Sequence, residues 1–130
     1  MTVRTGPCRA GYAEGRLKKA TEFLDAATLI ADDDAYSNAS VNLLVNAGIA
    51  ASDVICCVRL GVHAKGENHD EAASLLAKAD PAVERHLRVL LGVKSKVAYT
   101  HEPVSAQEQK KSTRAAEALV ETARRTSSSR

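Results

Sequence analysis

Apolar residues recur at steps of three and four along most of this chain, which is the spacing of helices that bury one face. A first segment runs from about Ala13 to Ala31 and a second from about Ser37 to His63. The second is apolar nearly all round, as is typical of a helix at the centre of a fold. The stripe of the first segment consists of Leu17, Ala20, Leu24, Ala27 and Ala31.

Three further helices are predicted from their start signals. One follows Asn68, and the next opens at Asp80-Pro81, an N-cap aspartate with proline at the first helical position, and ends at Gly92. The last helix has the clearest start. There, Ser105-Ala-Gln-Glu108 matches the capping box S-x-x-E, and Pro103 prevents continuation from upstream.

This pattern predicts an all-α fold, an up-and-down four-helix bundle with one additional short helix. The bundle is expected over residues 13–125, with a flexible N-terminus over 1–12 and a disordered tail over 126–130. The tail, Thr-Ser-Ser-Ser-Arg, has no apolar residue to bury. The composition agrees with this fold class, because one Phe and no Trp leave the core to aliphatic residues and to alanine, a strong helix former.

Charge is nearly balanced along the chain as a whole. A net charge of +2, from 18 basic and 16 acidic residues, is too small to indicate strong nonspecific binding of nucleic acid. Its distribution still allows a local basic surface at residues 85–88 and 94–96. Arg88 and Lys94 belong to these runs, although alternating charge on a helix is usually an ordinary solvated surface.

The cysteines and the apolar runs indicate in which cellular compartment the protein is expected. Neighbouring cysteines on a helix cannot reach each other in disulfide geometry, and no C-x-x-C is present. We therefore predict that Cys8, Cys56 and Cys57 are buried free thiols in a reducing cytoplasm. Residues 1–10 contain no apolar run, so no secretory signal is expected. Polar residues interrupt the segment from Leu43 to Val58, which is predicted to be a buried helix and not a membrane span.

The densest cluster of reactive side-chain types is Lys94-Ser-Lys-Val-Ala-Tyr-Thr-His101. Cleaving RNA without a metal requires a proton acceptor, a proton donor and a cation near the phosphorane-like transition state. The K-x4-H pair Lys96 and His101 supplies a fixed cation and a group that titrates near neutrality, and Tyr99 adds a hydroxyl donor. The alternative is a solvated loop histidine without a catalytic role.

A second set, Asn42, Asn46 and Asp53, lies on one side of the predicted second helix at steps of four and seven. A buried carboxylate needs a partner. Lys94, Lys96 or Arg59 are the candidates, and they would make Asp53 a supporting group beneath the basic loop. The alternative is a structural hydrogen bond between helices.

No metal or cofactor site is predicted. His63 and His69 flank a glycine turn at a spacing that matches no common ligand motif, and neither cysteine nor carboxylate completes a set with them or with His86. We expect these histidines on the surface.

Several runs together resemble HEPN domains, the higher-eukaryote and prokaryote nucleotide-binding helical bundles. The C-terminal half of that family is similar to Lys94-Ser-Lys-Val-Ala-Tyr99, Pro103-Val-Ser105, Glu108 and the alanine-rich run 115–123. Its opening helix resembles Arg16-Leu-Lys-Lys-Ala-Thr-Glu-Phe-Leu24. The resemblance covers about residues 13–125 in helix order and length, and its specific part is confined to 94–123.

The resemblance implies a homodimer with paired R-x4-6-H motifs and RNA cleavage without metal, often as a toxin paired with a nucleotidyltransferase-type antitoxin. On this chain the family histidine would be His101, and its arginine would fall at Lys96, which keeps the charge but lacks the bidentate fork. A second registration matches Lys94 and Tyr99 to members without that motif. The implied function is an RNA-directed module of a toxin–antitoxin or defence system. Whether it is an enzyme, or a non-catalytic nucleotide-binding or protein-docking module, stays open.

One surface is compatible with the implied dimer. The predicted second helix carries small residues that allow close packing of another helix. They are Ala47, Gly48, Ala51 and Ser52.

Overall fold

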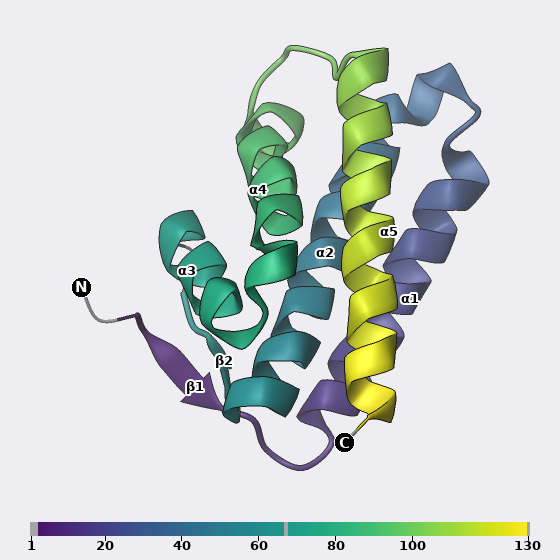
Figure 1. Ribbon diagram of the computed structural model, residues 1–130. Coiled ribbons are helices and arrows are strands. Elements are labelled where there is room, and N and C mark those ends of the chain that lie inside the picture. Colours follow the sequence, from purple (N-terminus) through teal and green to yellow (C-terminus); the bar gives the residue numbers. More distant parts are fainter. Residues whose placement is uncertain (1–2, 67, 130) are drawn as a thin grey trace.

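The computed structural model describes residues 3–66 and 68–129, and this part of the chain is mostly helical. It contains five α-helices, two short 3-10 helices and one two-stranded sheet (Figure 1). In chain order the elements are β1 Thr5–Pro7, α1 Tyr12–Ile30, η1 Asp34–Tyr36, α2 Ser37–Leu60, β2 Val62–Ala64, α3 His69–Ala79, η2 Pro81–Val83, α4 Glu84–Tyr99 and α5 Ala106–Ser128.

Helix α2 lies at the centre and packs against α1, α3, α4 and α5 (Figure 1). Its apolar side chains are buried on nearly every side, as the sequence predicts. Small residues let the neighbouring helices approach closely. A Cβ added at Gly48 would collide with Leu90 of α4 and lie 3.3 Å from Leu119 of α5. The small-residue surface around Gly48 is therefore covered within one chain and cannot serve a dimer.

The predicted all-α class is confirmed at the level of a mostly helical, bundle-like arrangement of helices. By length and composition alone, the stretch Asp34–Leu60 would also pass as a membrane span, but 67% of an apolar 18-residue part of it is buried inside the protein. That burial is what a central core helix requires, so the apolar character of α2 is explained by packing.

The N-terminal segment differs from the prediction of a flexible stretch over residues 1–12. Strand β1 pairs antiparallel with β2, with Thr5 opposite Ala64 and Pro7 opposite Val62. Cys8 then forms a disulfide with Cys57 at the end of α2. The prediction of a flexible segment is wrong for residues 5–8, because a sheet and a covalent bond hold them; residues 1 and 2 lie outside the described part.

The disulfide also corrects the prediction of three free thiols. Only Cys56, which is buried, stays free. Cys56 and Cys57, which are adjacent on α2, do not bridge each other, as predicted. Cys57 instead pairs with Cys8, which is 49 residues away in sequence and is brought to it by the sheet. Burial raises the pKa of the Cys56 thiol to about 12, so this group is an inert part of the core.

Helix starts and ends differ in how well they follow the prediction. The capping box at Ser105 and Glu108 is confirmed, and so is the glycine stop at Gly61, which has a φ of 76°. Gly92 does not end α4, which continues to Tyr99. At the other end of the chain, α5 extends to Ser128, so the predicted disordered tail is wrong for 126–128; residue 130 lies outside the described part.

Candidate functional site

The predicted catalytic residues lie at the end of α4 and in the connection to α5. Lys96 and Tyr99 are in the last turns of α4, and His101 is in the connection that follows. The connection is fixed at one point, where the buried Val104 donates its backbone N–H to Asn38 Oδ1 over 2.9 Å. Before that point the side chains of Tyr99 and His101 are exposed, and Tyr99 is 79% accessible.

Lys96 is engaged in a structural interaction. Its Nζ lies 2.9 Å from Glu108 Oε1, and the same oxygen accepts the backbone N–H of Ser105 at 2.8 Å. The hydrogen bonds from Ser105 and from Lys96 lower the pKa of Glu108 to about 2. Lys96 therefore reinforces the start of α5, and its charge is already balanced by Glu108 in the absence of a phosphate.

Arg88 is also committed to neighbours within the chain. Its guanidinium donates to Glu84 over 2.8 Å and to Asp70 over 3.3 Å. The bond to Asp70 ties α4 to α3 at a largely exposed position, whereas the bond to Glu84 lies within α4. The charge of Arg88, part of the predicted basic surface, is therefore already balanced by carboxylates within the chain.

An exposed cationic surface lies instead on α5. Lys110, Lys111 and Arg114 project from neighbouring positions of the helix and, with Ala106 and Gln107, line a shallow hollow. None of the three forms an ion pair with any residue between 3 and 66 or between 68 and 129. We call Lys110, Lys111 and Arg114 the α5 basic face.

Asp53 is paired with residues that the sequence did not suggest. Arg16 Nε donates to Asp53 Oδ2 over 3.0 Å, and the Tyr12 hydroxyl reaches the same oxygen at 3.3 Å. The predicted partners Lys94, Lys96 and Arg59 are wrong, because the N-terminal turns of α1 pack against this part of α2. No sequence pattern linked Arg16 or Tyr12 of α1 to Asp53, so this pairing could not be predicted.

A stacked pair of rings completes this cluster. The rings of Tyr12 and His63 lie 4.4 Å apart and nearly parallel, and His63 Nδ1 lies 2.9 Å from the Ala64 carbonyl oxygen. Burial, followed by the charge of Asp53, raises the pKa of Tyr12 to about 12. Burial also raises the pKa of Asp53, and the nearby Arg16 opposes that rise. His63 is thus part of a partly buried cluster, not the surface histidine that was expected.

Asp53 does not lie beneath the α4–α5 connection. That connection is bonded to Asn38, and Asp53 is 15 residues further along α2, which is about 22 Å at the helical rise per residue. The prediction that Asp53 lies beneath the loop that carries His101 is therefore wrong. Asn46 is half-buried between these two levels, and Asn42 is exposed. Neither asparagine side chain forms a hydrogen bond within the described residues.

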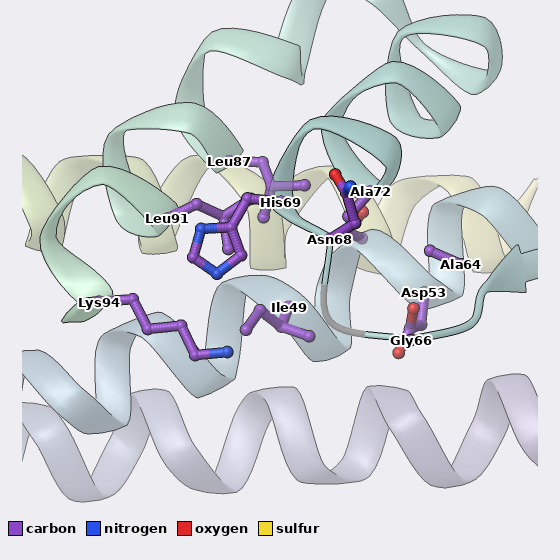
Figure 2. Close-up of a pocket in the computed structure, with 11 residues that line it drawn as sticks. Ile49, Asp53, Ala64, Gly66, Asn68, His69, Ala72, Leu87, Leu91 and Lys94 are labelled. Carbon is purple, nitrogen blue, oxygen red and sulfur yellow. The ribbon is translucent and has the colours of Figure 1, made fainter. Parts of the chain in front are cut away.

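Two of the predicted residues do come together, Asp53 and Lys94. They line a cavity of about 220 Å³ between α2, α3, α4 and the segment after β2 (Figure 2). His69, which the sequence did not single out as a ligand-binding residue, lines the same cavity with Ser52. Apolar walls are supplied by Ile49, Ala72, Leu87 and Leu91. This cavity unites one cation and one carboxylate that are far apart in sequence.

Comparison with known proteins adds no family. No protein-family model matches the chain, and searches of curated proteins and of solved structures find no significant match. The resemblance to HEPN domains therefore stays a prediction, and function has to be argued from the geometry.

Proposed function

We propose that this protein is an HEPN-like, RNA-directed module that binds the phosphates of single-stranded RNA. The α5 basic face carries this proposal. Lys110, Lys111 and Arg114 are exposed, close together and free of ion pairs within the described residues, whereas Lys96 and Arg88 are neutralised by carboxylates. Cations without internal partners are the ones that can replace the counterions of a polyanion.

Features at the same end of the molecule suit a single strand better than a duplex. The α5 basic face follows the α4–α5 connection, and Tyr99 just before that connection exposes most of its ring. Exposed aromatic rings stack on unpaired bases while cations track the backbone. The α5 basic face together with the Tyr99 ring therefore suits a short stretch of single-stranded RNA.

The finer description of the fold belongs to the same proposal. An up-and-down four-helix bundle of α1, α2, α4 and α5, with α3 as the additional short helix, is supported by the packing of α1 on α2, of α2 on α5 and of α4 on both α2 and α5. An experimental structure whose helix pairs differ from these would remove this support.

RNA binding is tested by charge reversal on the α5 basic face. The triple variant K110E/K111E/R114E should bind a labelled single-stranded RNA at least about tenfold more weakly and reduce the slope of log K against log salt by about 2, since about 0.7 is expected for each lost phosphate contact. Fluorescence anisotropy at several salt concentrations measures both quantities.

The matched control has the same change in charge at exposed lysines elsewhere. K18E/K19E/K78E alters three residues of α1 and α3 that are exposed and free of ion pairs within the described residues. An equal loss of RNA affinity in the two variants would mean that binding depends on net charge and not on the α5 basic face. This result would contradict the proposal.

A metal-independent endoribonuclease is the second candidate, favoured by the exposure of His101. In that candidate His101 is the acid/base group, Lys96 the phosphate clamp and Tyr99 a hydroxyl donor. Wild-type protein should then cleave a mixed RNA pool in the presence of chelator, and His101→Ala should abolish cleavage with unchanged folding. RNA that stays intact with wild-type protein ends this candidate.

The bond between Lys96 and Glu108 favours the non-catalytic alternative, a nucleotide-binding or docking module for a nucleotidyltransferase-type partner. A clamp that stabilises a helix start in the resting protein is not poised for phosphate. The two candidates separate with Glu108→Gln, which releases Lys96. If Lys96 is the phosphate clamp, Glu108→Gln should speed RNA cleavage. If Lys96 is not the clamp, the variant should leave the affinity of the α5 basic face for RNA unchanged.

A homodimer is part of the proposal, with α1 as the surface between two copies. Leu29 is 85% exposed, and with Leu17 and Ala26 it borders a hollow along α1. A two-fold pairing would cover the same face on both copies. Light scattering at tens of micromolar should give a dimer that Leu29→Glu dissociates and that Val89→Glu, at an exposed position of α4, leaves intact. A wild-type monomer contradicts this arrangement.

A cytoplasmic location is proposed from the sequence, and the bond between Cys8 and Cys57 weighs against it. Reducing compartments keep most thiol pairs open. Trapping thiols with an alkylating agent in intact cells, followed by mass spectrometry of the two cysteine peptides, decides between a reduced and an oxidised pair.

A further inference from the structure

The cavity between α2, α3 and α4 shares no lining residue with the hollow at the α5 basic face, and its charged groups lie on opposite sides. Lys94 and His69 reach toward one space beside Ile49, and Asp53 lies on the other side of Ile49, near Gly66 (Figure 2). One side of the cavity therefore presents nitrogen groups and the other a carboxylate. The wall between them is hydrocarbon, from Ile49 and Leu91.

The cation of this cavity has no counter-charge among the residues that the structure describes. Lys94 is half-buried and forms no ion pair with any residue in the described ranges 3–66 and 68–129. A half-buried ammonium group without a counter-charge is an unfavourable arrangement that an anion would relieve. This distinguishes Lys94 from Lys96, whose charge is balanced by Glu108.

The carboxylate of the cavity retains an accepting atom. Both of its bonds, from Arg16 and from Tyr12, end on Asp53 Oδ2. Oδ1 accepts no hydrogen bond from the described residues, although the side chain is only 13% exposed. A carboxylate has about four lone-pair positions, so Asp53 can accept a further donor without releasing Arg16.

From this arrangement we propose that the cavity binds a small zwitterion, a carboxylate and an ammonium group joined by a short hydrocarbon chain. Lys94 and His69 bind the carboxylate, Asp53 accepts from the ammonium group, and Ile49 and Leu91 contact the methylene groups between them. A cavity of about 220 Å³ suits an amino acid of modest length and excludes a nucleotide. The site is independent of the α5 basic face and of the proposed RNA binding.

The proposal is tested with a homologous series of straight-chain ω-amino acids, from glycine to 6-aminohexanoate. Isotope-labelled full-length protein is titrated with each compound, and the shifts of Ile49, His69 and Leu91 are followed by NMR. Because the two charged ends of the cavity are fixed, one chain length should bind at least about tenfold more tightly than the shortest. Saturation is expected below about 10 mM, the range of a weak small-molecule complex.

Compounds with one charged end test each side of the cavity without altering the protein. Butyrate lacks the ammonium group and butylamine lacks the carboxylate, and both should bind at least about tenfold more weakly than the best amino acid. Butyrate that binds as tightly as the amino acid would remove Asp53 from the site and overturn the proposal.

The variant Lys94→Met keeps the apolar part of the side chain and removes its charge. It should therefore lower the affinity for the tightest-binding amino acid about tenfold or more. Lys65→Met is the matched control, because Lys65 is an exposed lysine near the cavity that does not line it. Thermal unfolding of both variants verifies that they fold. Unchanged affinity in Lys94→Met, or no saturable shift with any member of the series, overturns the proposal.

Discussion

Two ends of this molecule contrast in how their polar residues are held. The disulfide end consists of residues 5–16 and 53–64, and the loop end of residues 96–108. At the disulfide end, bonds join residues far apart in sequence, such as Cys8 to Cys57 and Arg16 to Asp53. At the loop end most bonds are local, such as Lys96 to Glu108 and Thr100 to Lys96.

The contrast shows that density of reactive residue types along the sequence does not indicate where a fold builds a connected polar cluster. Residues 94–101 hold two lysines, a tyrosine and a histidine, yet Tyr99 and His101 face solvent. The cluster of Tyr12, Arg16, Asp53 and His63 comes from three separate elements. Tertiary packing, not sequence proximity, concentrates charge and burial there.

Opening the disulfide should have the largest effect on stability. Because the bond joins residues 49 apart, its removal should lower the free energy of unfolding by about 4 kcal/mol in the chain-entropy model. Urea unfolding of the wild-type protein with and without a phosphine reductant measures the loss.

The control for this prediction is Cys8→Ser, which lacks the bond under both conditions. Its urea midpoint should match that of the reduced wild-type protein and should not respond to the reductant. If the reductant leaves the wild-type midpoint unchanged, the disulfide does not stabilise this end of the molecule.

Arg16→Met should have the second largest effect, about 2–3 kcal/mol near neutral pH, because it removes the cation that is hydrogen-bonded to Asp53, whose side chain is only 13% exposed. Arg88→Met is the control, since its carboxylate partners are at the surface and the loss there should be much smaller. Urea unfolding of both variants gives the comparison, and equal losses would contradict the contrast between buried and exposed pairs.

The effect of Arg16→Met should depend on pH in one direction. Burial raises the pKa of Asp53 in the folded protein above the ordinary value of 3.8, and loss of Arg16 raises that pKa further. The protonated carboxyl is thus favoured by folding, and this contribution is lost as pH rises through the folded pKa. The cost of the variant should be smallest below pH 3.8 and should grow toward neutrality; a cost that is independent of pH would contradict it.

The sequence predicted the elements whose signals are local. The apolar stripe of α1, the capping box at Ser105 and the glycine stop at Gly61 each depend on residues within about two turns of a helix. These signals state where a helix begins or ends with little help from the rest of the chain. The exposure of His101 also agrees with the expected loop position.

The sequence did not predict the pairs that form between elements. Nothing near Cys8 indicates Cys57, and nothing near Asp53 indicates Arg16, because both pairs depend on how α1 and β1 lie against α2. The predicted helix end at Gly92 is wrong for a different reason. Glycine ends a helix only where the backbone adopts a positive φ, and Gly92 does not.

At the loop end, Ser105→Ala should cost about 1 kcal/mol by removing the hydroxyl that accepts the Glu108 N–H at the start of α5. Ser95→Ala, at an exposed position inside α4, is the control and should be nearly neutral. Thermal unfolding measures both, and equal stability of the two variants would show that the cap contributes nothing.

The loss of stability at low pH should depend in part on the protonation of Glu108 at the loop end. Its folded pKa is lowered from 4.5 to about 2, chiefly by the backbone hydrogen bond from Ser105. Its stabilising contribution is complete above pH 4.5 and is lost as pH falls toward 2. Glu108→Gln should therefore flatten the fall in stability over this range, as measured by urea unfolding at several pH values. If stability falls equally steeply at low pH in Glu108→Gln and in the wild-type protein, Glu108 does not contribute to the acid sensitivity.

The smallest expected effect comes from Gly92→Ala, and its sign is informative. Gly92 lies inside α4 with nothing within 4 Å of an added Cβ, so alanine should stabilise the protein by about 0.4–1 kcal/mol. Gly61→Ala, at a φ of 76°, should destabilise it by about 1 kcal/mol. Thermal unfolding of the pair measures both signs. A destabilising Gly92→Ala would mean that α4 stops before Lys94, which would move Lys94 and Tyr99 out of the helix and separate Lys94 from the cavity that it shares with Asp53.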